Sequence, residues 1–115
     1  MKICVPSLMP GGLMSNVAGD FSNASAYTLV SIDSEGKKGT EVVPNHTPGD
    51  PSLPGRLMGM GVSIVIVQNI TEDVLQGLWQ CGMRVYLEAV GTVDDTVNTY
   101  RNGFLPEATL DNLET

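Results

Sequence analysis

The side chain best suited to binding a metal in this 115-residue chain is the imidazole of His46, the only histidine. It lies within residues 44–51, a loop dense in proline, asparagine, glycine and aspartate. A histidine on such a loop can ligate a metal ion or a metal cluster. Because no second ligand follows nearby in the sequence, a solvent-exposed loop histidine is the alternative interpretation. We take His46 as the candidate metal ligand.

The cysteines and carboxylates form no catalytic pattern. Cys4 lies in the middle of an apolar strand, where a packed thiol is expected, and Cys81 falls at a predicted helix end. Asp94 and Asp95 are adjacent on a predicted helix, so their side chains point about 100° apart and suit helix capping better than a shared metal. Asp20 could bind a hard cation or act as a general base, although a lone carboxylate more often caps a loop. Because no nucleophile lies beside a base, we predict that the chain is not an enzyme.

The pattern of residues 61–91 predicts a strand–helix–strand unit against which the other elements pack. Residues 61–67 form a β-branched run broken only by Ser63, which is typical of a strand covered on both faces. A helix then begins at Thr71, buries a stripe that includes Trp79, and ends at Gly82. The chain returns as a strand, and a right-handed crossover of this length makes the two strands parallel.

The whole sequence predicts one α/β domain over residues 1–105, followed by a flexible tail at residues 106–115. Turn-forming residues separate the remaining elements from one another. These elements are strands at residues 2–5, 26–32, 39–43 and 83–87, and helices at about residues 52–60 and from Thr92 onward.

These elements gather the loops of the chain at one end of the sheet. If the first strand lies beside the strand at residues 61–67 and parallel to it, the carboxyl ends of the parallel strands meet there. All three helices would begin at this end, which we call the loop pole, and would point N–H groups at it. The geometry predicts a site for an anion. Its candidate residues, besides His46, are Gly11, Gly12, Asp20, Phe21, Ser22, Asn23, Asn69, Thr71 and Thr92.

The composition excludes two classes of partner. A formal net charge of −7 and a pI near 4.3 oppose binding to nucleic acid, which needs clustered Lys and Arg side chains. The same charge opposes binding to a membrane surface, and no apolar stretch approaches the ~20 residues that span a bilayer. No secretion signal is evident, so we expect a cytoplasmic protein. A nuclease is excluded too, because the predicted central strands carry no carboxylates.

Several segments follow one another in a recognisable order and spacing. They are residues 1–6, 11–13, 20–30, 45–49, 53–57, 61–66 and 91–100. Together they resemble the dinitrogenase iron–molybdenum cofactor biosynthesis family, which includes NifX-like proteins and the carboxy-terminal domain of NifB. The resemblance covers almost the whole chain.

The resemblance implies a ribonuclease-H-like α/β fold, with a five-stranded mixed sheet in the order 3-2-1-4-5 and three flanking helices. It also implies non-enzymatic carriage of an iron–molybdenum cofactor precursor or a related metal–sulfur cluster, in contact with cofactor-assembly proteins. The chain has Asp20-Phe21-Ser22 where the family often has His-Phe-Gly, and a carboxylate suits a soft cluster metal less well than an imidazole. An interaction or regulatory module that has lost cluster binding is therefore the alternative.

Overall fold

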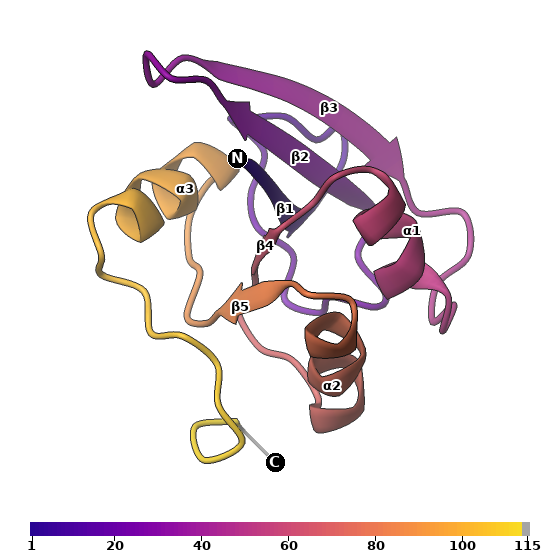
Figure 1. Ribbon diagram of the computed structural model, residues 1–115. Coiled ribbons are helices and arrows are strands. Elements are labelled where there is room, and N and C mark those ends of the chain that lie inside the picture. The colour runs from indigo at the N-terminus through magenta and orange to yellow at the C-terminus, as the bar shows by residue number, and fades with distance from the viewer. Residues whose placement is uncertain (114–115) are drawn as a thin grey trace.

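The computed structural model describes residues 1–113 and contains a five-stranded mixed sheet with three helices (Figure 1). The strands are β1 (Lys2–Ser7), β2 (Ala26–Ile32), β3 (Lys38–Pro44), β4 (Ile64–Ile66) and β5 (Arg84–Tyr86). Their spatial order is β3-β2-β1-β4-β5, which confirms the predicted order. β2 is antiparallel to both β1 and β3, whereas β4 and β5 continue the sheet parallel to β1. The ribonuclease-H-like label stays a prediction.

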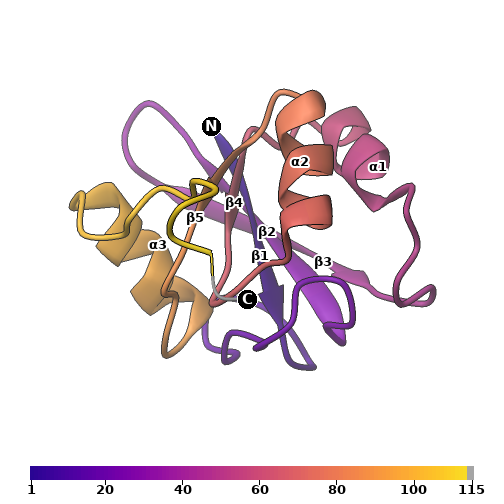
Figure 2. The ribbon, with the colours of Figure 1, turned by 90° about the horizontal axis from the view of Figure 1, so that it is seen from below.

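The helices cover both faces of the sheet, as Figure 2 shows. They are α1 (Leu53–Gly59) and α2 (Glu72–Gln80) on one face and α3 (Val93–Arg101) on the other. Neighbouring residues of β1 point to opposite faces, so Cys4 packs with Leu57 and Leu78 while Val5 packs with Val97. This double burial explains why β1 and β4 are apolar throughout. No helix within residues 1–113 is long and apolar enough to cross a membrane.

The buried stripe of α2 is narrower than the sequence predicts. Leu75 and Leu78 are fully buried, but Trp79 is 37% exposed. Trp79 lies at the edge of the apolar stripe and in the last turn of the helix, so solvent reaches its indole ring. The expectation that Trp79 belongs to the core was wrong.

The segment after α3 packs against the sheet, in contrast to the flexible tail that the sequence predicts for residues 106–115. The N–H of Leu87 donates to the carbonyl of Pro106 at 2.9 Å, and the N–H of Ala108 donates to that of Val85 at 2.7 Å. Ala108 is only 2% exposed. Because β5 lies at the edge of the sheet, its outer N–H and C=O groups need partners, and this segment supplies them. Residues 114–115 lie outside the described residues.

Candidate functional site

The strand register brings four loops to one end of the sheet. Ser7, the last residue of β1, pairs with Ala26, which in turn pairs with Pro44, the last residue of β3. The parallel strands β4 and β5 point the same way as β1. The loops at residues 8–25, 45–52, 67–71 and 87–92 therefore all lie at the loop pole, as the sequence predicts.

The long loop after β1 divides between the two faces of the sheet. Its glycine-rich part lies on the α3 face, where the N–H of Gly12 donates to Thr28 Oγ1 at 3.1 Å and Gly11 lies against Val42. Its second part lies on the opposite face, where Phe21 belongs to the core that α1 and α2 cover. The predicted site residues at the loop pole thus fall into two groups, on opposite faces of the sheet.

The chain itself supplies acceptors for the backbone N–H groups at the start of α3. The N–H of Val93 donates to the carbonyl of Ser15 at 2.8 Å, and the N–H of Asp94 donates to that of Leu13 at 2.9 Å. Thr92 and Asp95 form a capping box, in which each side chain accepts the backbone N–H of the other. Thr92 therefore lies at the loop pole, but the N–H groups beside it already have acceptors.

The starts of the other two helices differ from each other. At α1, the N–H of Leu53 donates to the carbonyl of Asp50, and the second residue is Pro54, which has no N–H. At α2, Thr71 is the N-cap residue but its side chain makes no capping hydrogen bond. The described residues also supply no acceptor for the N–H of Glu72 in the first turn. The start of α2 is thus the more open of the two.

A cavity of about 220 Å³ lies between the Phe21–Ser22 turn, residues 49–54 and the first half of α2. Phe21, Leu53 and Val74 give it an apolar wall, and Ser22 and Asp73 supply polar groups. Of the predicted site residues, this cavity unites Phe21 and Ser22 and places them beside α2. We take it as the candidate site and call it the α1–α2 cavity.

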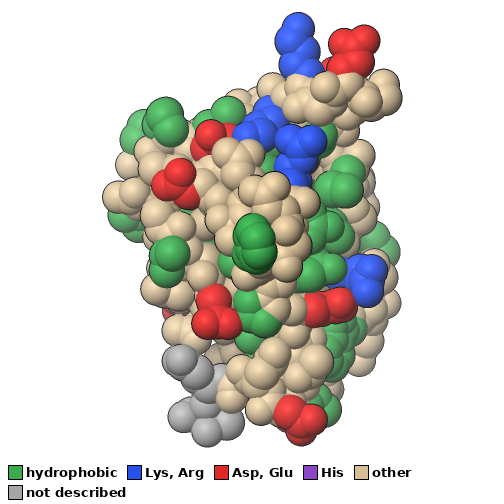
Figure 3. Space-filling view, turned by 90° about the vertical axis from the view of Figure 1, so that its left-hand side faces the viewer, with side chains coloured by type: hydrophobic (Ala, Val, Ile, Leu, Met, Phe, Trp, Pro, Cys, Tyr) green, Lys and Arg blue, Asp and Glu red, His purple; other side chains and the backbone are tan. Residues whose placement is uncertain are grey.

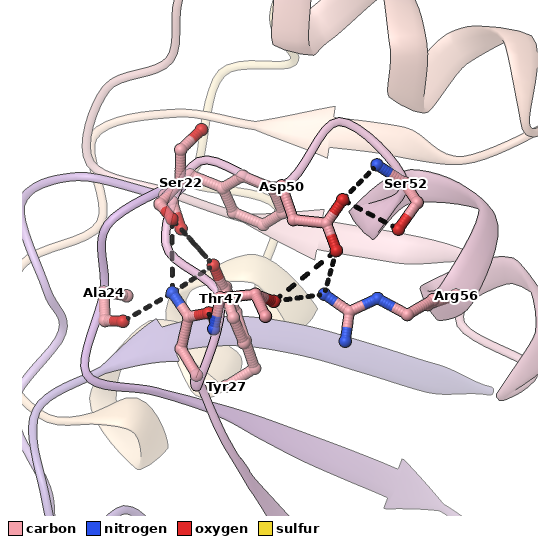
Figure 4. Close-up of polar contacts among 9 residues, drawn as sticks. Ser22, Ala24, Tyr27, Thr47, Asp50, Ser52 and Arg56 are labelled. Carbon is pink, nitrogen blue, oxygen red and sulfur yellow. Dashed lines mark hydrogen bonds and ion pairs between the residues drawn. The ribbon is translucent and has the colours of Figure 1, made fainter.

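Figure 4 shows the hydrogen bonds that fix one wall of the α1–α2 cavity. The side-chain amide of Asn45 donates to the carbonyls of Ser22 and Ala24, at 3.2 and 2.9 Å. The N–H of Gly49 donates to the carbonyl of Ser22 at 3.1 Å. The hydroxyl of Tyr27 donates to the carbonyl of Phe21 at 2.6 Å. The loop at residues 20–23 and the loop at residues 44–51 are therefore one connected unit.

Asp50 organises the other wall of the cavity. It accepts hydrogen bonds from both the N–H and the hydroxyl of Ser52, each at 2.9 Å, and it pairs with Arg56 at 3.4 Å. These hydrogen bonds, and secondarily the guanidinium charge, lower the pKa of Asp50 below its ordinary value. The ionised carboxylate thus has a structural role: it fixes the turn that leads into α1.

The described part of the chain offers no preformed metal centre. Within it, no three His, Cys, Asp or Glu side chains come together. His46 is exposed on the loop pole, and Asp20 accepts from the N–H of Ser22 at 3.0 Å and from the amide of Asn23 at 2.7 Å. Cys4 is fully buried, and burial raises the pKa of its thiol. Asn69 lies in a second cavity, beside Glu88.

Charge is distributed unevenly over the molecule. Asp73 lines the α1–α2 cavity and Glu88 lines the second cavity, so exposed carboxylates border both cavities. Figure 3, which looks onto α3 and the C-terminal segment, shows Lys and Arg side chains gathered around the hairpin between β2 and β3. The loop pole is therefore not a basic surface, although helix N-termini point toward it.

Sequence reasoning missed several residues of the α1–α2 cavity. Asn45, which joins the two loops, was assigned no role, and neither was Gly77. A Cβ atom added at Gly77 would lie 3.4 Å from Pro54 Cγ, in ordinary contact, so the glycine leaves space between the two helices. A glycine inside a helical pattern is a recognisable signal of close packing, and it could have pointed to this groove.

The chain matches the family model "Dinitrogenase iron-molybdenum cofactor" over residues 1–103. A Thermotoga protein provisionally assigned as NifB is 26% identical, with a TM-score of 0.76 and coverage of 92% of this chain and 91% of that one. The apo form of the orange protein from Desulfovibrio gigas is 19% identical, with a TM-score of 0.79 and coverage of 94% and 92%. A Methanocaldococcus jannaschii protein provisionally assigned as a dinitrogenase is 20% identical, with a TM-score of 0.75 and coverage of 95% of each chain. No curated protein matches the chain significantly. The chain belongs to the dinitrogenase iron–molybdenum cofactor family.

Proposed function

We propose that this protein is a non-enzymatic carrier, whose cargo is an iron–molybdenum cofactor precursor or a related metal–sulfur cluster. The family match over residues 1–103 supports the class of cargo. The placing of the cargo at the α1–α2 cavity is supported by one observation. The two hydrogen bonds of the Asn45 side chain join the loop at residues 20–23 to the loop of His46 beside this cavity. The predicted cytoplasmic location and ribonuclease-H-like classification belong to the same proposal.

The small number of metal ligands near the site favours a weakly bound cargo. Within residues 1–113 there is no group of three ligating side chains, so His46 would be the one metal ligand. The hydroxyl of Ser22 and the N–H groups at the start of α2 would supply hydrogen bonds to the cluster sulfurs. A cargo held in this way can pass to a cofactor-assembly protein without the breaking of several metal–ligand bonds.

The carboxylates near the site should make cargo uptake depend on the salt concentration. An anionic cluster that approaches a protein of formal charge −7 is repelled, and Asp73 adds to the repulsion at the cavity. Salt screens such repulsion over about 10 Å at 0.1 M ionic strength. We therefore expect cargo uptake to rise with ionic strength, which is the opposite of binding at a basic patch.

Anaerobic uptake of metal tests the proposal. Protein is incubated with iron, sulfide and molybdate, desalted, and its metal content and visible absorption are measured. We expect a coloured species, with retention reduced about tenfold by His46→Ala, a loss of about 1.4 kcal/mol, because the hydrogen bonds to the cluster sulfurs would remain when the metal ligand is removed. Asn102→Ala, at the far end of α3, is the matched control. If the protein takes up no metal while a competent relative does so in the same batch, the proposal is wrong.

One observation favours a second candidate, an interaction module that does not bind a cluster. Asp20 stands where the family often has histidine, and its two carboxylate oxygens are engaged by Ser22 and Asn23. This candidate predicts a protein partner that protects residues 21–25 from hydrogen exchange. Protection of those residues by a cofactor-assembly protein, without metal uptake, would favour it over the carrier.

A further inference from the structure

A cavity of about 280 Å³ lies at the carboxyl ends of β4 and β5 and shares no residue with the α1–α2 cavity. Its polar lining includes Gln68, Asn69 and Glu88. Its apolar lining includes Ile70 and Leu87, which are 7% and 6% exposed. It therefore offers an apolar surface beside carboxamide and carboxylate groups.

Glu88 occupies an unusual backbone conformation in this cavity. Its φ angle is 68°, and among the described residues it is the one non-glycine residue with a positive φ. Glycine adopts this region freely, whereas a residue with a Cβ atom is strained there. Glu88 is exposed, and the hydrogen bond that it donates within the described residues runs from its backbone N–H to the carbonyl of Gln68 at 3.3 Å, so its carboxylate faces solvent. Within residues 1–113, no hydrogen bond or ion pair of the Glu88 side chain offsets this strain.

The C-terminal segment completes the cavity. Asn112 and Leu113 form part of its lining, and the amide of Asn112 donates to the carbonyl of Glu107 at 3.0 Å. The Glu107 carboxylate pairs with Arg84 of β5 through two hydrogen bonds, at 3.1 and 3.3 Å. This wall lies beyond residue 103, where the family match ends.

We propose that this cavity binds a small organic cation, an ammonium or guanidinium compound with a short carbon chain. The Glu88 carboxylate accepts hydrogen bonds only, and the carboxamide oxygens of Gln68 and Asn69 add further acceptors. No Lys, Arg or His lines the cavity within the described residues, so an anion would find no counter-charge. The carbon chain would lie over Ile70 and Leu87. The inference does not depend on the proposed cargo, which is an anion.

Titrations of the full chain, followed by amide NMR shifts, test this proposal. The probes are n-butylguanidinium, n-butylammonium and, as an anion of similar size, butyrate. We expect the two cations to shift the signals of residues 68–70, 87–88 and 112–113, and butyrate to leave them unchanged. Equal shifts with butyrate, or no shift with either cation, would overturn the proposal.

Substitutions at Glu88 separate binding from stability. Glu88→Gln keeps the size and the backbone strain, and it should weaken binding of the cations about tenfold, a loss typical of a removed charge-assisted hydrogen bond. Glu88→Gly should abolish binding and also raise the midpoint of urea unfolding, because glycine relieves the strain. Glu35→Gln, in the exposed hairpin turn, is the matched control. Unchanged affinity in Glu88→Gln would show that the carboxylate does not bind a cation. Glu88→Gln should still take up metal as the wild type does. A loss of cation binding in this variant can therefore be told apart from a failure of carrier function.

Discussion

The backbone N–H of Val93 donates to the carbonyl oxygen of Ser15 at 2.8 Å, so the glycine-rich loop closes the start of α3. An anion at this helix start would need the same N–H groups. The loop pole therefore has a face on which the chain satisfies its own donors, and another, beside α2, where it does not. This division makes the α1–α2 cavity the better candidate for ligand binding.

Removal of the capping box at α3 should destabilise the protein. Thr92→Ala removes the acceptor for the N–H of Asp95, and a lost N-cap costs about 1 kcal/mol. Thr99→Ala is the control, because its hydroxyl bonds only to a carbonyl of its own helix, and it should change stability by less than about 0.5 kcal/mol. Urea unfolding followed by circular dichroism measures both. Equal effects of the two substitutions would contradict a stabilising role for the cap.

Substitutions at Gly11 and Gly12 separate the free-energy cost of a steric clash from the cost of backbone strain. Both have positive φ angles, of 81° and 95°. An added Cβ would lie 2.6 Å from Val42 Cγ1 at Gly11, but would meet nothing within 4 Å at Gly12. Gly12→Ala should cost about 1 kcal/mol from strain, and Gly11→Ala should cost a further 1–3 kcal/mol, roughly, from the clash. Adding Val42→Ala should restore part of the loss in Gly11→Ala and none of it in Gly12→Ala. The unfolding free energies of the two single and the two double variants are the measurement.

The sheet could be predicted from sequence because its signals are local. The β-branched run ending at Val67 and the crossover that follows it predict the parallel pair of β4 and β5, and the hairpin predicts the pairing of β2 with β3. The site could not be predicted as well, because its residues meet only through long-range contacts. Nothing local shows that Asn45 reaches Ala24, or that the carbonyl of Ser15 reaches the start of α3. The packing of Ala108 was missed because its partner, the edge of β5, exists only in the folded sheet.

The Asn45 side chain should stiffen the candidate site. Asn45→Ala removes the side-chain donor to the carbonyl of Ala24 and one of the donors to the carbonyl of Ser22, which keeps the N–H of Gly49. An unsatisfied partly buried group costs about 1–3 kcal/mol. We expect faster hydrogen exchange at Gly49, whose N–H bonds to the same Ser22 carbonyl. Asn102→Ala, at the end of α3, serves as the control for loss of an amide side chain. Unchanged exchange at Gly49 would show that the two loops are held together by other contacts.

Asp50 should contribute to stability in a pH-dependent way. Its pKa is lowered in the folded state by the N–H and hydroxyl of Ser52 and by Arg56, so the unfolded chain binds its proton more readily. The contribution is present above the ordinary carboxyl pKa of 3.8 and is lost as the pH falls through the lower folded value. Asp50→Asn should therefore flatten the fall in unfolding free energy below about pH 5, whereas Glu35→Gln controls for removal of a carboxylate. Parallel pH profiles for wild type and Asp50→Asn would contradict the assignment.

The two cysteines should differ sharply in reactivity, because they differ in exposure. Cys4 is fully buried in the centre of the sheet, and burial raises the pKa of its thiol, so almost no reactive thiolate forms near pH 8. Cys81, the C-cap residue of α2, is half-buried and free. Iodoacetamide should thus give a single adduct, at Cys81, in the native protein, as mass spectrometry of peptides would show. In Cys81→Ser, Cys4 should react only when urea unfolds the chain, because its alkylation requires opening of the sheet. Rapid native labelling of Cys4 would mean that β1 is accessible without unfolding.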